Sequence, residues 1–122
     1  MPGIQPKARE GAFLWLIKIL AGLSIVIVLG IHFVVNHLVA PEGLLNYSDV
    51  VRYYQNPWVV TMEIFFLITV VTHALIGIRS ILLDLNPSDS LLSIINLILA
   101  VAGVGAVTYG IWLALEIASR GQ

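Results

Sequence analysis

Three histidines are the residues of this 122-residue chain with the widest choice of chemistry. The sequence contains no cysteine, so His32, His37 and His73 are the only transition-metal ligands we expect. The lack of thiolates also excludes disulfides and iron–sulfur clusters. An imidazole nitrogen can ligate a haem iron, or it can form a hydrogen bond within a packed core. The surroundings of each histidine must therefore distinguish these roles.

The neighbours of His73 at helical spacing suit a haem ligand. Gly77, four residues on, would leave room for a flat macrocycle beside the imidazole. The ring N–H that does not face iron needs an acceptor, and either the Thr69 hydroxyl or a helix carbonyl would serve. Arg79 would pair with a haem propionate or act as a positive membrane anchor. The alternative for His73 is a buried histidine that hydrogen-bonds across helices.

His32 has a polar neighbour on its own helical face. Asn36 lies four residues on and would orient the His32 ring. His37 is five positions on, about 140° around the helix, so it does not easily address the same site. We expect His32 to be either a haem ligand or a buried hydrogen-bonding residue.

The composition identifies the solvent of this chain. Apolar residues make up 59% and charged residues 11% of the sequence, and the mean hydropathy is +0.98. A soluble domain carries about 25% charged residues, and one this small buries only about two thirds of its surface. Lipid must therefore solvate part of the chain. A net charge of −1 without a basic tract excludes nucleic-acid binding.

Three apolar stretches predict an all-α membrane protein with three transmembrane helices. Two of them run for 23 and 26 residues without a formal charge, which exceeds the roughly 20 residues that a span needs. The middle one carries Glu63 and Arg79 near its ends, where long side chains reach the headgroups. We expect spans at 13–38, 58–83 and 90–115 in a single membrane-anchor domain, 1–122.

The connections between the spans carry helix signals. Asn56 followed by Pro57 predicts the start of the second span, and Ser88 or Asp89 is expected to cap the third. Residues 46–54 indicate a short surface helix whose tyrosines lie at the membrane interface.

Small residues recur on the third span at four-residue spacing, at Ala102, Ala106 and Gly110. Such a stripe lets another helix approach closely, either within this chain or in a partner. Because three helices seldom enclose a cofactor alone, both alternatives predict a larger bundle.

The distribution of Lys and Arg favours a cytoplasmic N-terminus. His73 then lies toward the cytoplasm and His32 near the opposite face, about 20 Å apart along the membrane normal. One iron cannot take both, so two histidine ligands would mean two haems, each completed by a histidine of another subunit or by an exogenous ligand. The cations on the cytoplasmic side are Lys7, Arg9, Lys18 and Arg79, against Arg52 and Arg120 on the other.

The segment 73–84, HALIGIRSILLD, resembles the smaller membrane-anchor (cytochrome b) subunit of succinate dehydrogenase, complex II. That family carries a histidine, a glycine four residues on and an aspartate eleven residues on, within three spans. The resemblance implies that His73 is an axial haem b ligand and that Asp84 lies near the quinone pocket. Where the family often has a quinone-binding tyrosine, this chain has Leu85, so a partner is expected to supply that contact.

His32 and His37 resemble the two-haem members of the family, in which the first span ligates the distal haem. The resemblance implies one or two haem b groups, with quinone as substrate. It also implies three partners: a second membrane-anchor subunit, an iron–sulfur subunit and a flavoprotein subunit. This chain would be non-catalytic alone, in a prokaryotic cytoplasmic membrane.

Two alternatives stay open. A fumarate reductase anchor would have the same architecture, because direction depends on the quinone potential and the partners. A cofactor-free structural subunit of another membrane complex would also fit the hydropathy. For Asp84, the alternative is an ordinary polar residue near a helix end.

Overall fold

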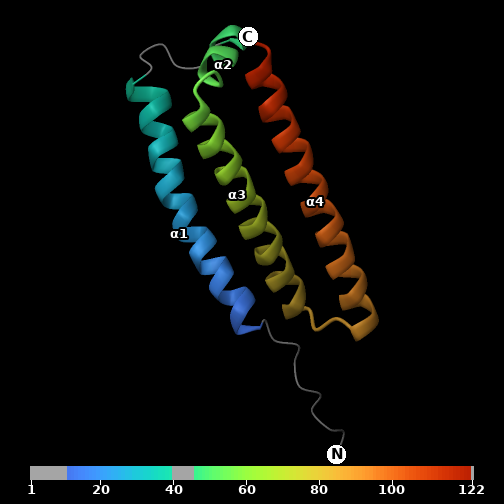
Figure 1. Ribbon diagram of the computed structural model, residues 1–122. Coiled ribbons are helices and arrows are strands. Elements are labelled where there is room, and N and C mark those ends of the chain that lie inside the picture. Colours follow the sequence, from blue (N-terminus) through green and yellow to red (C-terminus); the bar gives the residue numbers. More distant parts are fainter. Residues whose placement is uncertain (1–10, 40–45, 122) are drawn as a thin grey trace, which may run out of the picture.

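The computed structural model describes residues 11–39 and 46–121, and this part of the chain is helical without strands (Figure 1). The predicted all-α fold is confirmed. The elements are α1 (Ala12–Val34), the π-helical turn η1 (Val35–Val39), α2 (Tyr47–Tyr53), α3 (Pro57–Asp84) and α4 (Asp89–Ser119).

Three of the helices are long and apolar enough to cross a membrane. They are α1, α3 and α4, with 23, 28 and 31 residues. At 1.5 Å per residue, even the shortest reaches about 34 Å, against roughly 30 Å of hydrocarbon. Large apolar side chains such as Phe13, Val26 and Val104 are exposed along all three. This surface must be covered by lipid or by other membrane subunits.

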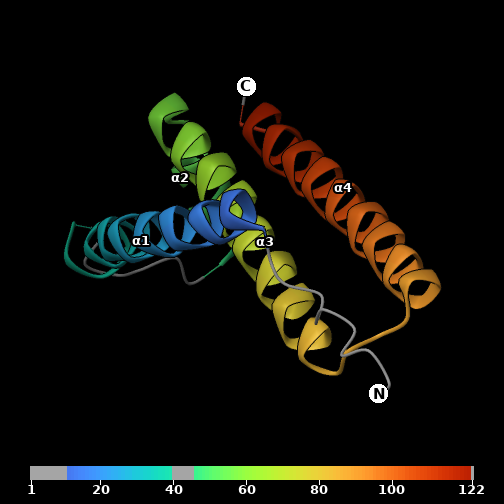
Figure 2. The ribbon, with the colours of Figure 1, turned by 90° about the horizontal axis from the view of Figure 1, so that it is seen from below.

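Helix α3 is the centre of the assembly, and α1 and α4 pack on it from different sides (Figures 1 and 2). Both flanking helices run antiparallel to α3. One end of the bundle, the turn end, holds the start of α1 and the α3–α4 connection. The other, the α2 end, holds α2 and the last residues of α4.

The connection between α3 and α4 follows the predicted cap. The Ser88 hydroxyl accepts a hydrogen bond from the Leu91 N–H at 3.3 Å, and Asp89 lies in the first turn of α4. Asn86 has a left-handed backbone, with φ of 52°, which asparagine adopts more readily than most residues. These residues reverse the chain within four positions and make α3 and α4 neighbours.

At the α2 end, the predicted surface helix is confirmed. The Asn46 side chain accepts from the Asp49 N–H at 3.0 Å, and the Asp49 carboxylate accepts from the Asn46 N–H at 3.2 Å. This capping box starts α2. Gln55 then donates to the carbonyl oxygen of Ala118 at 3.1 Å, which ties the end of α2 to α4.

The contact between α3 and α4 uses small residues of α4. A Cβ at Gly103 would lie 2.5 Å from the Leu75 side chain, and one at Gly110 would collide with Leu67. Of the stripe predicted from the sequence, only Gly110 takes part, because Ala102 and Ala106 are exposed. Four-residue spacing drifts by about 40° per step in a 3.6-residue helix, so the stripe does not stay on one face.

Candidate functional site

The His73 ring points from α3 to the backbone of α1. Its Nδ1 lies 3.1 Å from the carbonyl oxygen of Lys18. A carbonyl only accepts, so Nδ1 carries a proton, and in the neutral ring Nε2 then keeps its lone pair. This is the tautomer that a histidine needs to ligate a metal through Nε2.

Two glycines leave space around His73. A Cβ at Gly22 would lie 3.1 Å from the imidazole Cε1, so glycine permits the close approach of α1 to the ring. Apart from its chain neighbours and its own helical backbone, no described atom lies within 4 Å of the place where a Cβ of Gly77 would stand. The open space at Gly77 agrees with the room that the sequence suggested for a macrocycle.

Thr69 is buried, and its hydroxyl donates to the Phe65 carbonyl of its own helix at 2.7 Å. Of the two acceptors considered for His73, the structure therefore uses a carbonyl, and that carbonyl belongs to α1. Lys18 also contributes its ammonium group, which donates to Ser80 at 3.0 Å. Lys18 thus joins α1 to α3 at two points near the turn end.

The side chain of Arg79 bonds to α4. Its Nε donates to the Asn96 side-chain oxygen at 2.8 Å, while its Nη1 is buried without an acceptor among the described residues. A guanidinium is always charged, and a buried donor without an acceptor is costly. The surrounding cavity of about 360 Å³ is bordered by all three long helices through Leu14, Thr72, Leu75, Ile76, Leu99 and Ala100.

His32 forms a different kind of contact at the α2 end. Its Nδ1 lies 2.9 Å from Oε1 of Glu63, and the Tyr53 hydroxyl donates to the same oxygen at 2.9 Å. The ring also stacks on Phe66, with centroids 5.9 Å apart. The side chain of Asn36, the expected neighbour of His32, lies outside the described part of the chain.

Glu63 also borders a second, smaller cavity of about 230 Å³ between α3 and α4, which Tyr54 lines as well. Burial, and then the negative charge of Glu63, raise the pKa of Tyr54 above its ordinary value. A polar cluster therefore occupies the α2 end beside His32.

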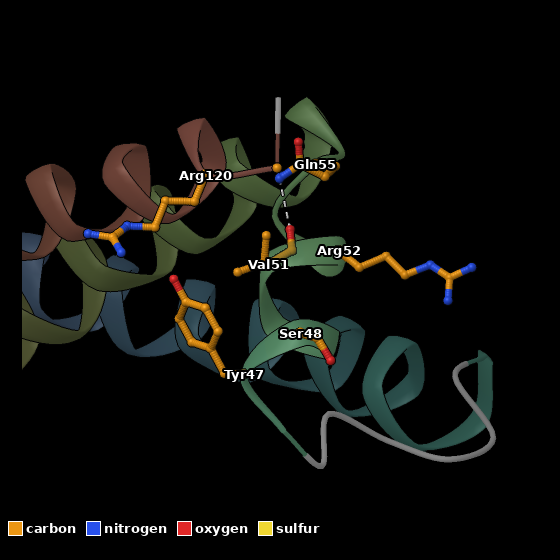
Figure 3. A pocket seen from close by; sticks show the side chains of 7 residues that line it. Tyr47, Ser48, Val51, Arg52, Gln55 and Arg120 are labelled. Carbon is orange, nitrogen blue, oxygen red and sulfur yellow. Dashed lines mark hydrogen bonds between the residues drawn. The ribbon is translucent and has the colours of Figure 1, made fainter.

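A further hollow at the α2 end is open and lacks a converging set of charges. It measures about 620 Å³ and is lined by residues of α2, Gln55, Arg120 and Gly121. Figure 3 shows Arg52 and Arg120 pointing in opposite directions. Arg120 is paired with Glu116 at 2.9 Å. This hollow is a seam between α2 and α4, not a built anion site.

The two histidine environments lie far apart along α1. Lys18 marks the level of His73, and His32 follows fourteen residues later, about 21 Å at 1.5 Å per residue. A single iron cannot bind both rings. Within the described residues, no three His, Cys, Asp or Glu side chains come together as a metal-binding group. Each histidine would therefore supply one ligand and need a second from elsewhere.

The chain matches a known protein family over most of its length. Residues 5–107 match the family described as succinate dehydrogenase/fumarate reductase transmembrane subunit. The chain belongs to this family. It is 29% identical over 103 residues to the succinate dehydrogenase hydrophobic membrane anchor subunit of Archaeoglobus fulgidus, covering 84% of this chain and 87% of the relative. No solved structure matches this chain.

The family membership confirms the resemblance carried by the segment 73–84, and the three long apolar helices make this transmembrane subunit an integral membrane protein. The family description covers succinate dehydrogenase and fumarate reductase alike, so both directions of reaction agree with it. The alternative of a structural subunit from another membrane complex does not agree with the family description.

The sequence does not reveal the partners of several polar groups in this transmembrane subunit. Glu63 was interpreted as a charge reaching the headgroups, whereas it accepts hydrogen bonds from His32 and Tyr53. The available signal was its depth, because an acidic residue within a span usually has a partner. For Asn96, a polar residue within a span, the sequence predicts a protein or ligand partner, and Arg79 is that partner. The Lys18 carbonyl carried no such signal, since every residue has a carbonyl.

Proposed function

We propose that this chain is the membrane anchor of a succinate:quinone oxidoreductase and that His73 is an axial ligand of haem b. The observation that supports this most is the bond from His73 Nδ1 to the Lys18 carbonyl, because it leaves Nε2 free for iron. The open space at Gly77 and the buried Nη1 of Arg79, which has no acceptor among the described residues, agree with a flat, negatively charged cofactor. The residues around His73 therefore fit a haem.

His32 would ligate a second, distal haem through Nε2, with Asn36 as a supporting neighbour. The hydrogen bond from Nδ1 to Glu63 leaves that nitrogen free, as the carbonyl does for His73. A b-type haem supplies a one-electron carrier when it is bound. This chain contributes one axial ligand to each haem, and a second membrane-anchor subunit contributes the others.

Arg79 would pair with a haem propionate, since its buried Nη1 has no acceptor among the described residues and a guanidinium suits a carboxylate. Asp84, an exposed residue at the end of α3, would border the quinone pocket. Leu85, 76% exposed, has no group to hydrogen-bond a quinone, so a partner supplies that contact.

The turn end would face the cytoplasm and dock the iron–sulfur and flavoprotein subunits. Those subunits would carry the flavin and cluster chemistry, because this chain has no cysteine with which to bind a cluster. The same arrangement would serve a fumarate reductase if the quinone potential and the partners reversed the flow of electrons.

The test is the haem content of the purified complex. We expect His73→Ala to remove one b-type haem from the reduced absorption spectrum, while the complex still inserts into the membrane. His37→Ala is the matched control, because His37 is exposed and packs only on Phe33 among the ring contacts described, at 4.8 Å. An unchanged haem content in the His73 variant would reject the ligand assignment.

A further inference from the structure

One carboxylate oxygen joins three elements at the α2 end. Glu63 Oε1, on α3, accepts from His32 on α1 and from Tyr53 on α2, each at 2.9 Å. The side chain of Glu63 is 14% exposed and that of His32 is 32% exposed. Water therefore competes little for this oxygen, which keeps the hydrogen bonds strong.

These contacts hold the His32 ring in two ways. The Nδ1 bond to Glu63 sets the tautomer and directs Nε2 away from the carboxylate. Phe66 fixes the plane of the ring, stacking on it with an angle of 28° between the planes. Both partners lie on α3, so the orientation of a side chain on α1 depends on its neighbouring helix.

The acceptor for His32 differs in charge from the acceptor for His73. His73 donates to a neutral backbone carbonyl, whereas His32 donates to a carboxylate. A carboxylate attracts the Nδ1 proton more strongly and makes Nε2 a better electron donor. A negative charge near an iron also favours the ferric over the ferrous state.

We propose that Glu63 is the positioning residue of His32 and that its carboxylate lowers the potential of the His32-bound haem. The proposal rests on the proposed ligation of a distal haem by His32. Glu63 does not itself contact the iron. It acts through the imidazole, and Tyr53 moderates it by donating to the same oxygen.

The experiment is a redox titration of both haems in the purified complex, followed by absorption and electron paramagnetic resonance spectra. Glu63→Gln keeps an acceptor oxygen but removes the charge. We expect its distal haem to remain bound and to shift to a more positive potential, by about a tenfold change in the ferrous-to-ferric ratio, or about 59 mV. The His73 haem should not move.

Two further variants separate a positioning role from a general loss of structure. Tyr53→Phe removes a donor from Glu63 and leaves the His32 bond, so the carboxylate becomes a stronger acceptor. We expect the distal potential to shift the other way, to more negative values. Glu63→Leu removes the acceptor, and we expect it to weaken retention of the distal haem by about 10- to 100-fold.

The matched control is Glu116→Gln, which removes a carboxylate at the same end that is paired with Arg120. It should leave both potentials unchanged. If His32→Ala keeps every haem, the ligation fails and the role of Glu63 fails with it. If His32→Ala removes a haem, the ligation stands. The role of Glu63 is then overturned if Glu63→Gln and Tyr53→Phe leave the potential of that haem unchanged, or if both variants shift it in the same direction.

Discussion

At the scale of single residues, the packing around His73 depends on the lack of a Cβ at Gly22. Gly22 faces the imidazole so closely that a methyl group there would lie 3.1 Å from Cε1 and 3.4 Å from Nδ1. The ring would have to shift by a few tenths of an ångström, and its bond to the Lys18 carbonyl would lengthen. With the proposed ligation, the alignment of Nε2 with the haem iron would depend on that bond.

We therefore expect Gly22→Ala to broaden or shift the absorption band of the His73 haem and to lower its occupancy. Gly30→Ala is the control on the same helix, because no described atom beyond its chain neighbours and its own helical backbone lies within 4 Å of its Cβ position. Both changes raise helix propensity by about 1 kcal/mol, so a general effect on α1 would appear in both. Equal spectra for the two variants would show that the close approach of Gly22 is irrelevant to the cofactor.

At the scale of elements, α4 presents two different faces built from small residues. One face, with Gly103, Gly110 and the buried Ala114, packs on α3. The other, with Ala102 and Ala106, stays exposed on this chain. Helices in lipid associate through close packing of small residues, because apolar side chains gain little by leaving lipid for a neighbouring helix.

Replacing Gly110 by Leu should force α3 and α4 apart, because a Cβ at this position already collides with Leu67. Overpacking of this kind costs about 1–3 kcal/mol, and we expect a lower melting temperature of the complex. Ala106→Leu should leave the α3–α4 contact intact, as measured by cross-linking of the two helices. A Gly110 variant with unchanged melting would contradict the packing described for α4.

At the scale of the whole molecule, the two histidines belong to opposite ends of a single bundle. His73 lies toward the turn end with Lys18, and His32 lies toward the α2 end with Glu63. Sites about 20 Å apart with no shared partner behave independently, so changes at one should add to changes at the other. Which end faces which side of the membrane would decide the order of the two proposed haem sites along the electron path.

The absence of cysteine makes this orientation easy to measure, because a single cysteine is then the only one in the chain. Ser90 at the turn end and Ser48 at the α2 end are both exposed. With a cytoplasmic N-terminus, we expect a membrane-impermeant maleimide added to intact cells to label Ser48→Cys and not Ser90→Cys. The reverse pattern would invert the proposed topology and place His32 nearer the catalytic subunits.

The sequence alone determined the solvent, the number of long helices and the capped start of α4 at Ser88 and Asp89. These features follow from local rules, because hydropathy, length and caps depend on residues close together in the chain. The segment from His73 to Asp84 carried the family in the same local way. The sequence alone did not determine the partners of the candidate side chains.

Only the tertiary structure decided that His73 meets the Lys18 carbonyl, that His32 meets Glu63 and that Arg79 meets Asn96. A soluble helix shows its inward face by an apolar stripe, but helices apolar on every side carry no such mark. The side of α3 that meets α1 therefore cannot be inferred from periodicity. Packing around a few glycines selects those faces, and that packing sets which polar groups share a bond.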